Sequence, residues 1–255
     1  MNEETLFNRL RQVYRFPFQS PGWEQRYLIG AGLIFVSFLI PILPAIFVCG
    51  YILRLLRQAT AGDDLVLPEW RDWGELALDG LRYLVASLVY LLPGIVVMIL
   101  GMGAYFFSFF SGVMSAQAND AAMGFVMLIS MLILFLSMAL GMLLLLLGTI
   151  PLPMALAHCA AKKSLGAAFR IGQWWPLLRL NKLDYFIAWV NLAGLAAVMY
   201  TLIIMAYYSL VLICLVIPLS AFVGYYLALV FAGLFGRIYR ESLQKVGDKA
   251  AGTEV

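Results

Sequence analysis

Long apolar stretches alternate along the chain with short segments that hold nearly all of its charge. The stretches 27–53, 83–157 and 183–236 contain only two charged residues, Asp120 and Asp184. A helix needs about 20 apolar residues to cross the hydrocarbon core of a bilayer, and each of these stretches is longer than that. The pattern therefore predicts an all-α, polytopic helical membrane protein.

The apolar stretches predict about six membrane passes. Residues 83–157 and 185–236 are each long enough for two spans. The first stretch, 27–53, is interrupted by prolines at positions 41 and 44, and each proline removes a helix hydrogen bond. This stretch is either one kinked span or a short hairpin, and a re-entrant pair buried against its neighbours describes the hairpin equally well.

The distribution of lysine and arginine favours the hairpin. The segments 1–26, 54–82, 158–182 and 237–255 contain 4, 4, 5 and 4 of these residues. Positive residues accumulate on the cytoplasmic side of a membrane, and a single span across 27–53 would place four of them on each side. We therefore expect a short proline-broken hairpin and both termini in the cytoplasm.

These assignments describe a single membrane domain over residues 1–255. Its predicted parts are an N-terminal interfacial helix (1–26), a helical hairpin (27–57), an acidic, tryptophan-containing cytoplasmic loop (58–82), two spans (83–157), a basic aromatic interfacial segment (158–184), two further spans (185–236) and a cytoplasmic tail (237–255).

The first predicted part has the pattern of an amphipathic helix. On a helical wheel Leu6, Leu10, Val13 and Tyr14 fall on one side, opposite to a polar side that includes Arg11. Such a helix can lie in the membrane surface with its apolar face on lipid.

Composition agrees with the membrane class and limits the chemistry. The chain is 64% hydrophobic and 12% charged, about half the usual charged fraction of a soluble domain. Its net charge of +3 comes from basic residues beside spans, where they orient the chain and contact anionic lipid, so we expect no nucleic-acid partner. The cysteines Cys49, Cys159 and Cys214 have no paired spacing, which favours small buried residues without a disulfide or metal role.

The loop 58–82 has two interpretations. Asp72, Glu75 and Asp79 share one face of a short amphipathic helix, and Asp72 followed by Glu75 resembles a capping box. Alternatively, the carboxylates gather a divalent cation, which prefers hard oxygen ligands. We favour capping, because the loop lacks the fixed ligand spacing of a calcium motif. The candidate cation ligands are Asp63, Asp64, Glu69, Asp72, Glu75 and Asp79.

The segment 158–184 mixes basic and aromatic residues. Lysine and arginine attract anionic head groups, and tryptophan prefers the interfacial zone, so lipid binding is physically natural there. The alternative is an anchoring elbow that merely orients the next span. The candidate lipid-binding residues are Lys162, Lys163, Arg170, Trp174, Trp175 and Arg179.

The last apolar stretch carries small residues at every fourth position. Residues four apart share a helix face, and a face of small residues lets a neighbouring backbone approach closely. We expect a tight helix contact there, either with another span of this chain or with another protein. The candidate packing residues are Ser220, Gly224, Ala228, Ala232 and Gly236.

Residues suited to catalysis are scarce. The chain has no HExxH motif, no glycine-rich phosphate loop and no recognisable set of nucleophile, base and orienting residue. The single histidine, His158, stands at the predicted end of a span, where we interpret it as an interfacial belt residue rather than a metal ligand or base. We expect no cofactor and no metal.

Several passages resemble a known family. They are LPEWRDWGELALDGLRYLVASLVYLLP with the upstream GYILRLLRQATAGDD and RFPFQSPGW, together with AFRIGQWWPLLRLNKLDYFIAW and LFGRIYRES. The chain is similar in these passages to an uncharacterised prokaryotic membrane-protein family called domain of unknown function four thousand and thirteen. The resemblance implies a multi-pass protein of the prokaryotic cytoplasmic (inner) membrane. It implies no reaction and no catalytic residues.

These features together favour a non-enzymatic integral membrane protein, an accessory or scaffold subunit of a membrane complex. The expected partners are membrane lipids, anionic ones above all, and a membrane-protein partner or a second copy of the chain. The alternative is a permease or lipid-handling transporter, which the proline-broken helices support and the uncharged spans oppose. A membrane-embedded enzyme is the third class.

Overall fold

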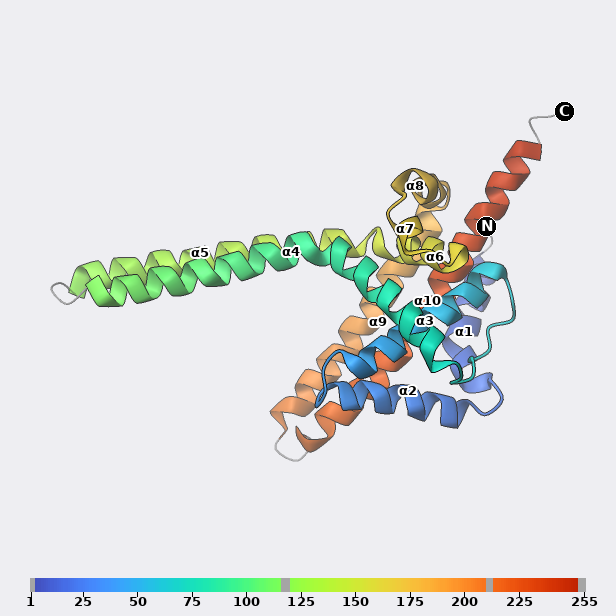
Figure 1. Cartoon of the computed structure of the whole chain (residues 1–255), viewed down its shortest axis with the longest axis horizontal. Helices are drawn as coiled ribbons and strands as arrows, with labels where there is room; N and C mark the ends of the chain where they lie inside the picture. The colour runs from blue at the N-terminus through green and yellow to red at the C-terminus, as the bar shows by residue number, and fades with distance from the viewer. Residues whose placement is uncertain (1–2, 116–119, 210–212, 252–255) are drawn as a thin grey trace. The chain divides into compact units, whose positions relative to one another are not determined.

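The computed structural model describes residues 3–115, 120–209 and 213–251, and within these ranges every regular element is a helix (Figure 1). The chain forms two compact units. Unit 1 contains Met1–Ala86 and Pro153–Val255, and unit 2 contains Ser87–Leu152. The all-α prediction is confirmed for the described part of the chain.

Four helical stretches are long and apolar enough to cross a membrane. They lie on the long helices α4 (Trp73–Ser115), α5 (Asp120–Thr149) with α6 (Leu152–Lys162), α9 (Lys182–Tyr208) and α10 (Ile213–Ala251). The candidate spans themselves are Trp73–Met114, Gly124–Lys162, Lys182–Tyr208 and Cys214–Asp248. The length and apolar character of these helices indicate a membrane protein. The two further passes expected from residues 27–53 are not among these spans.

Residues 27–53 belong to two helices rather than to one kinked span. Helix α2 (Trp23–Ser37) and helix α3 (Leu43–Ala61) are separated by a turn at residues 38–42, and the two helices pack against each other. Proline occupies position 44 in the first turn of α3, where a missing N–H is tolerated. The two prolines thus separate the helices where the sequence predicted a break.

Two helix boundaries differ from the predicted parts. Helix α4 begins at Trp73, so the short helix expected in the loop 58–82 continues without a break into the span predicted from residue 83. Helix α10 continues to Ala251 through most of the predicted tail. Sequence reasoning placed boundaries where charge begins, but a helix can continue into water once its hydrogen-bonding pattern is established.

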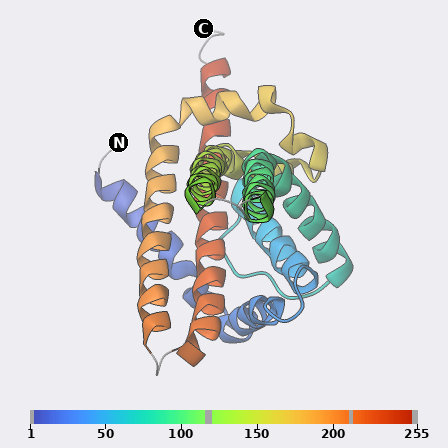
Figure 2. The same cartoon turned by 90° about the vertical axis from the view of Figure 1, so that its left-hand side faces the viewer.

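Helix α10 forms the centre of unit 1. It packs against α1 (Glu3–Gln19), α2, α3, α8 (Ile171–Leu180) and α9. Its side chains Tyr225, Leu229 and Phe235 are buried, as are Leu55 of α3 and Leu156 of α6. Helix α8, gold in Figure 2, lies across the end of α9 rather than along it.

The apolar face of α1 packs on protein in its described part. Val13 and Phe16 are almost fully buried, and both lie beside Gly233 of α10. The Tyr226 hydroxyl donates a hydrogen bond to the Tyr14 carbonyl at 3.1 Å. The side chains of Leu6 and Leu10 lie outside the described residues. The expectation that this face lies on lipid is therefore wrong for Val13, because the small side of α10 offers a closer apolar partner.

Unit 2 is an antiparallel helical hairpin of α4 and α5. Small residues at steps of seven along α4 meet small residues of α5. Ser108 accepts a 2.8 Å hydrogen bond from Ser130, and Gly101 lies against Ser137. Seven residues before Gly101, Gly94 lies beside Gly141, which follows Ser137 by four residues. This repeat of small residues allows the two backbones to approach closely along the hairpin.

Candidate functional site

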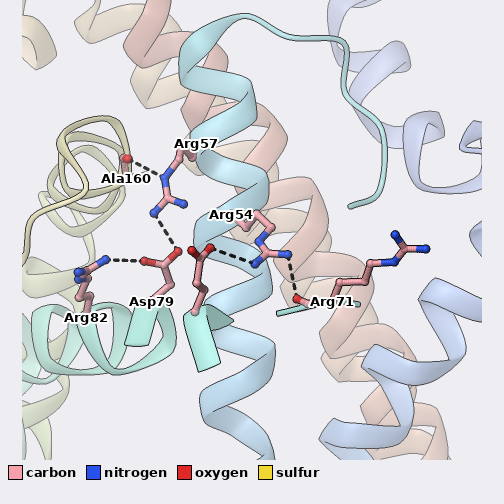
Figure 3. Close-up of polar contacts among 7 residues, drawn as sticks. Arg54, Arg57, Arg71, Asp79, Arg82 and Ala160 are labelled. Atoms are coloured by element: carbon pink, nitrogen blue, oxygen red, sulfur yellow. Dashed lines mark hydrogen bonds and ion pairs between the residues drawn. The ribbon is translucent and has the colours of Figure 1, made fainter. Parts of the chain in front are cut away.

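The most buried charged side chain of the predicted acidic loop is Asp79, on the first turns of α4. Its side chain is only 5% exposed, and its two carboxylate oxygens face two guanidinium groups (Figure 3). Arg57 of α3 lies 2.9 Å from one oxygen, and Arg82 lies 2.8 Å from the other. Arg57 also donates to the Ala160 carbonyl of α6 at 3.1 Å. These three side chains, which we call the Asp79 cluster, connect α3, α4 and α6.

A close crossing of α3 and α4 lies beside the Asp79 cluster. A Cβ added to Gly50 of α3 would overlap the Leu76 carbonyl of α4, and a Cβ added to Gly80 would overlap the Ile46 carbonyl. Only glycine fits both positions without moving a backbone. This crossing determines where Asp79 meets Arg57.

The other carboxylates of this region also pair with arginine. Glu75 lies 3.8 Å from Arg54. Glu69 lies 3.4 Å from Arg26 and 2.8 Å from Arg71. The carboxylates of these pairs are at least half exposed, so each pair contributes little to stability.

Aromatic contacts hold the same segment against the helices. Trp70 stacks on Tyr51 with 4.2 Å between ring centroids, and its indole N–H donates to the Arg26 carbonyl at 2.8 Å. The Tyr51 hydroxyl donates to the Pro68 carbonyl at 2.8 Å. The segment 67–75 is therefore fixed to α2 and α3.

The structure does not bring the six carboxylates together. Asp63 and Asp64 are exposed before the segment that carries the paired carboxylates. In the ranges that the structure describes, no group of three His, Cys, Asp or Glu residues is placed to hold a metal ion. The expectation that Asp79 is a solvated or cation-binding carboxylate is wrong, because arginines from α3 and α4 surround it.

Asp72 directly precedes the first residue of α4, as the capping interpretation requires. Its backbone carbonyl accepts the first intrahelical bond from the Leu76 amide at 3.0 Å. Its φ of 58° is left-handed, a region that aspartate tolerates better than most residues. Glu75 faces Arg54.

The predicted lipid-binding residues lie on an elbow formed by the end of α6, the short helix α7 (Leu165–Ala168) and α8. Lys162, Lys163 and Arg170 are exposed. Phe169 and Ile171 beside them are also exposed, the second at 53%. Basic and apolar side chains are thus both exposed along the elbow.

Trp174 does not belong to that surface. It is 1% exposed, and its indole N–H donates to the Ala168 carbonyl at 3.0 Å. Assigning it to lipid binding is wrong, because it lies on the side of α8 that packs into unit 1. Trp175 is half-buried, and the Arg179 guanidinium lies over its ring at 5.6 Å, within the range of a cation–π contact.

The stripe of small residues on α10 makes a close contact at one end. A Cβ on Gly236 would overlap Ala59 of α3, and Ala232 is fully buried. A Cβ on Gly224 would meet no atom within 4 Å, and Ser220 and Ala228 are half-exposed. Within this chain, α3 therefore reaches only the C-terminal end of the stripe, and a contact of Gly224 with another protein stays a prediction.

His158 is a buried residue rather than an interfacial one. It is 4% exposed, and its Nδ1 lies 2.7 Å from the Tyr239 hydroxyl while its Nε2 lies 3.1 Å from Gln173 Oε1. Both ring nitrogens thus have a protein partner. Sequence reasoning missed this polar connection between α6, α8 and α10 because its members are far apart along the chain.

Sequence reasoning also missed the Asp79 cluster. The spacing of Asp79 and Arg82 by three residues on one helix was an available signal. The third member, Arg57, comes from a different helix and had no local signal.

Comparison with known proteins places the chain in a family. The profile described as "Protein of unknown function (DUF4013)" matches residues 33–208, from α2 to the end of α9. No curated protein and no solved structure matches the chain. The match covers more than half of the sequence, as the resemblance in its Leu-Pro-Glu-Trp passage predicted, and the chain therefore belongs to the DUF4013 family of proteins of unknown function.

Proposed function

We propose that this chain is a non-enzymatic accessory or scaffold subunit in the cytoplasmic membrane, and that its α7–α8 elbow binds anionic lipid head groups. One observation carries the proposal. Arg170 is exposed between exposed Phe169 and Ile171 in the chain, and Lys162 is exposed on the same elbow, which is anchored to the protein by buried Trp174. Cations beside apolar side chains match the chemistry of a head group above its acyl chains.

The direction of α8 supports this role. Helix α8 lies across the end of α9, which is long and apolar enough to span a membrane (Figure 2). A helix crosswise to a span lies in the plane of the membrane surface. Arg170, which directly precedes α8, and Arg179 near its end then meet the head groups of the leaflet that the span enters.

The remaining polar groups support a structural role rather than catalysis. Asp79 is paired with two arginines, and both ring nitrogens of His158 have protein partners. A general base needs a free lone pair near its substrate. Asp79 and His158 are both buried.

The test compares lipid retention by two charge variants. Lys162→Gln with Arg170→Gln removes two exposed charges and leaves Arg179 on Trp175 and Lys163 at the left-handed end of α6. Each head-group contact contributes about 1 kcal/mol. The double variant should therefore retain anionic phosphatidylglycerol up to about 30-fold more weakly in mild detergent, with no change for phosphatidylcholine.

The matched control is Arg11→Gln with Arg15→Gln, two exposed arginines of α1. This pair removes the same charge from a helix whose described apolar face packs on α10. An equal loss of phosphatidylglycerol in both double variants would indicate a general charge effect and contradict the elbow as a lipid site. Proteins that co-purify in fixed ratio with the wild type test the accessory role separately.

A lipid-handling transporter is the second candidate. Helix α5 borders an open apolar groove of about 470 Å³, which could receive an acyl chain. The groove is lined by Ala139, Met142, Leu143, Leu145, Leu146 and Thr149. A bound amphiphile that is lost after Met142→Trp, without loss of phosphatidylglycerol at the elbow, would favour this function.

A further inference from the structure

The turn between α2 and α3 presents a continuous apolar surface. Every residue from Phe38 to Leu43 is exposed, with Leu39 at 72% and Ile42 at 69%. The stretch between Arg26 and Arg54 contains no charged residue. An exposed apolar turn of this kind indicates contact with protein or lipid rather than with water.

The backbone of this turn is suited to hydrocarbon. The N–H groups of Phe38 and Leu39 donate to the carbonyls of residues 35 and 36 at 3.2 and 2.9 Å, and that of Ile40 donates to residue 36 at 2.9 Å. The N–H groups of Leu43 and Ile46 are likewise bonded, to residues 41 and 42. The prolines at 41 and 44 have no N–H. Few backbone N–H groups of the turn therefore lack a hydrogen-bond acceptor. Acyl chains supply no acceptor, so this backbone can enter lipid without leaving many N–H groups unbonded.

Both ends of the hairpin are fixed to the same segment. Arg26, at the start of α2, donates to the Leu67 carbonyl and pairs with Glu69. Arg54 of α3 donates to the Arg71 carbonyl at 3.1 Å and pairs with Glu75. The two residues that flank the uncharged stretch thus bind the same segment, 67–75. The hairpin returns to the side from which it starts.

Charged and aromatic groups beside the hairpin indicate the position of the membrane–water interface. Arg71 and Glu75 are charged and each 77% exposed, and exposed charges of this kind require water around them. Trp73 lies between them in sequence and contacts Phe47 of α3 with ring centroids 5.2 Å apart. Tryptophan beside exposed charge is typical of the membrane–water interface.

The two arms of the hairpin are too short to cross a bilayer. Leu39 follows Arg26 by 13 residues, or about 20 Å at 1.5 Å per residue. Ile42 precedes Arg54 by 12 residues, or about 18 Å. The hydrocarbon core is about 30 Å thick. The turn therefore ends inside the hydrocarbon core and does not reach the opposite interface.

We propose that the α2–α3 turn is inserted into the acyl chains of the bilayer and does not cross the membrane. The occupant of its apolar surface is lipid hydrocarbon. The proposal depends on membrane residence but not on the elbow or on a preference for anionic lipid. It replaces two of the six predicted passes by one re-entrant contact.

The test measures depth with a fluorophore attached to single cysteines. The background carries Cys49→Ala and Cys214→Ala, while the buried Cys159 is kept. Leu39→Cys reports the turn, and Gly74→Cys is the matched control, because Gly74 is exposed and an added Cβ there meets no atom within 4 Å. Both variants carry bimane and are reconstituted into phosphatidylcholine vesicles, so anionic lipid has no part in the result.

Nitroxides on the acyl chains should quench the label at position 39 several-fold more than at position 74. Aqueous iodide should show the opposite order. Iodide quenching at 39 equal to that at 74 would place the turn in water, and protection from both quenchers would place it against protein. Either result overturns the proposal.

The side of the membrane is tested with a membrane-impermeant maleimide in sealed vesicles. Gln19→Cys and Gly74→Cys should react from the same side, and Leu39→Cys should react from neither. Reaction of Leu39→Cys from the side opposite to Gly74→Cys would mean that the hairpin crosses the bilayer, and the proposal would be wrong.

Discussion

Replacing Asp79 by asparagine tests whether the buried carboxylate stabilises unit 1. The substitution keeps the shape of the side chain but removes the charge that faces Arg57 and Arg82 at 2.9 and 2.8 Å. Two opposite charges about 4 Å apart attract by about 4 kcal/mol at an effective dielectric constant of about 20, and the desolvation cost of the charges offsets much of this.

The expected loss of stability depends on the two arginines that remain after the carboxylate is removed. Without the carboxylate, Arg57 and Arg82 remain beside each other, and their side chains are only 22% and 35% exposed. Removing one partner of a buried pair costs about 3–5 kcal/mol, and we take the lower end because solvent reaches both guanidinium groups. We expect Asp79→Asn to reduce the free energy of unfolding by about 3 kcal/mol.

Thermal unfolding in detergent, followed by circular dichroism, measures this effect. For a chain of this size about 3 kcal/mol corresponds to a decrease in Tm of roughly 6–12 °C. Glu75→Gln is the matched control: it makes the same chemical change four residues earlier, at a side chain that is 77% exposed and 3.8 Å from Arg54. It should change the stability by less than about 1 kcal/mol. Equal shifts for the two variants would refute the argument that burial gives the Asp79 pairs their strength.

Two further predictions concern glycines. Gly80→Ala should destabilise the fold by about 1–3 kcal/mol, because its Cβ meets the Ile46 carbonyl. Gly74→Ala, on the same helix in open space, should be neutral or stabilising by up to about 1 kcal/mol. A Tm measurement with the reverse order would contradict the close α3–α4 crossing. On α10, Gly236→Leu should lower Tm and Gly224→Leu should leave Tm nearly unchanged, since only Gly236 lies against another helix of this chain. A large decrease in Tm for Gly224→Leu would show that a partner covers the exposed end of the stripe.

The break between α2 and α3 and the class of the protein could be predicted from local sequence. Proline at 41 and 44 disrupts helix hydrogen bonding whatever the surroundings. An apolar stretch long enough to span a bilayer indicates a membrane protein even when the packing of the helices is unknown. The basic surface of the elbow was also visible, because exposed charges beside apolar residues need no tertiary partner. These features depend on neighbouring residues in the chain.

The roles of individual side chains were not predictable in the same way. Trp174 and Trp175 are adjacent and chemically identical, yet the first is buried and the second is half-exposed beneath Arg179. Gly224 and Gly236 belong to one stripe, yet α3 reaches only the second. Which residue of such a pair is buried in a contact depends on where another helix packs.

The sequence by itself determined that this chain is helical and apolar, where its first hairpin turns and where its charge gathers. Tertiary structure decided that Asp79 faces Arg57 rather than water, since that pair joins residues on two helices whose crossing depends on Gly50 and Gly80. The physical reason is that helix formation and hydrophobic burial follow patterns a few residues long, whereas an ion pair or a close helix contact requires two distant backbones to meet at one register.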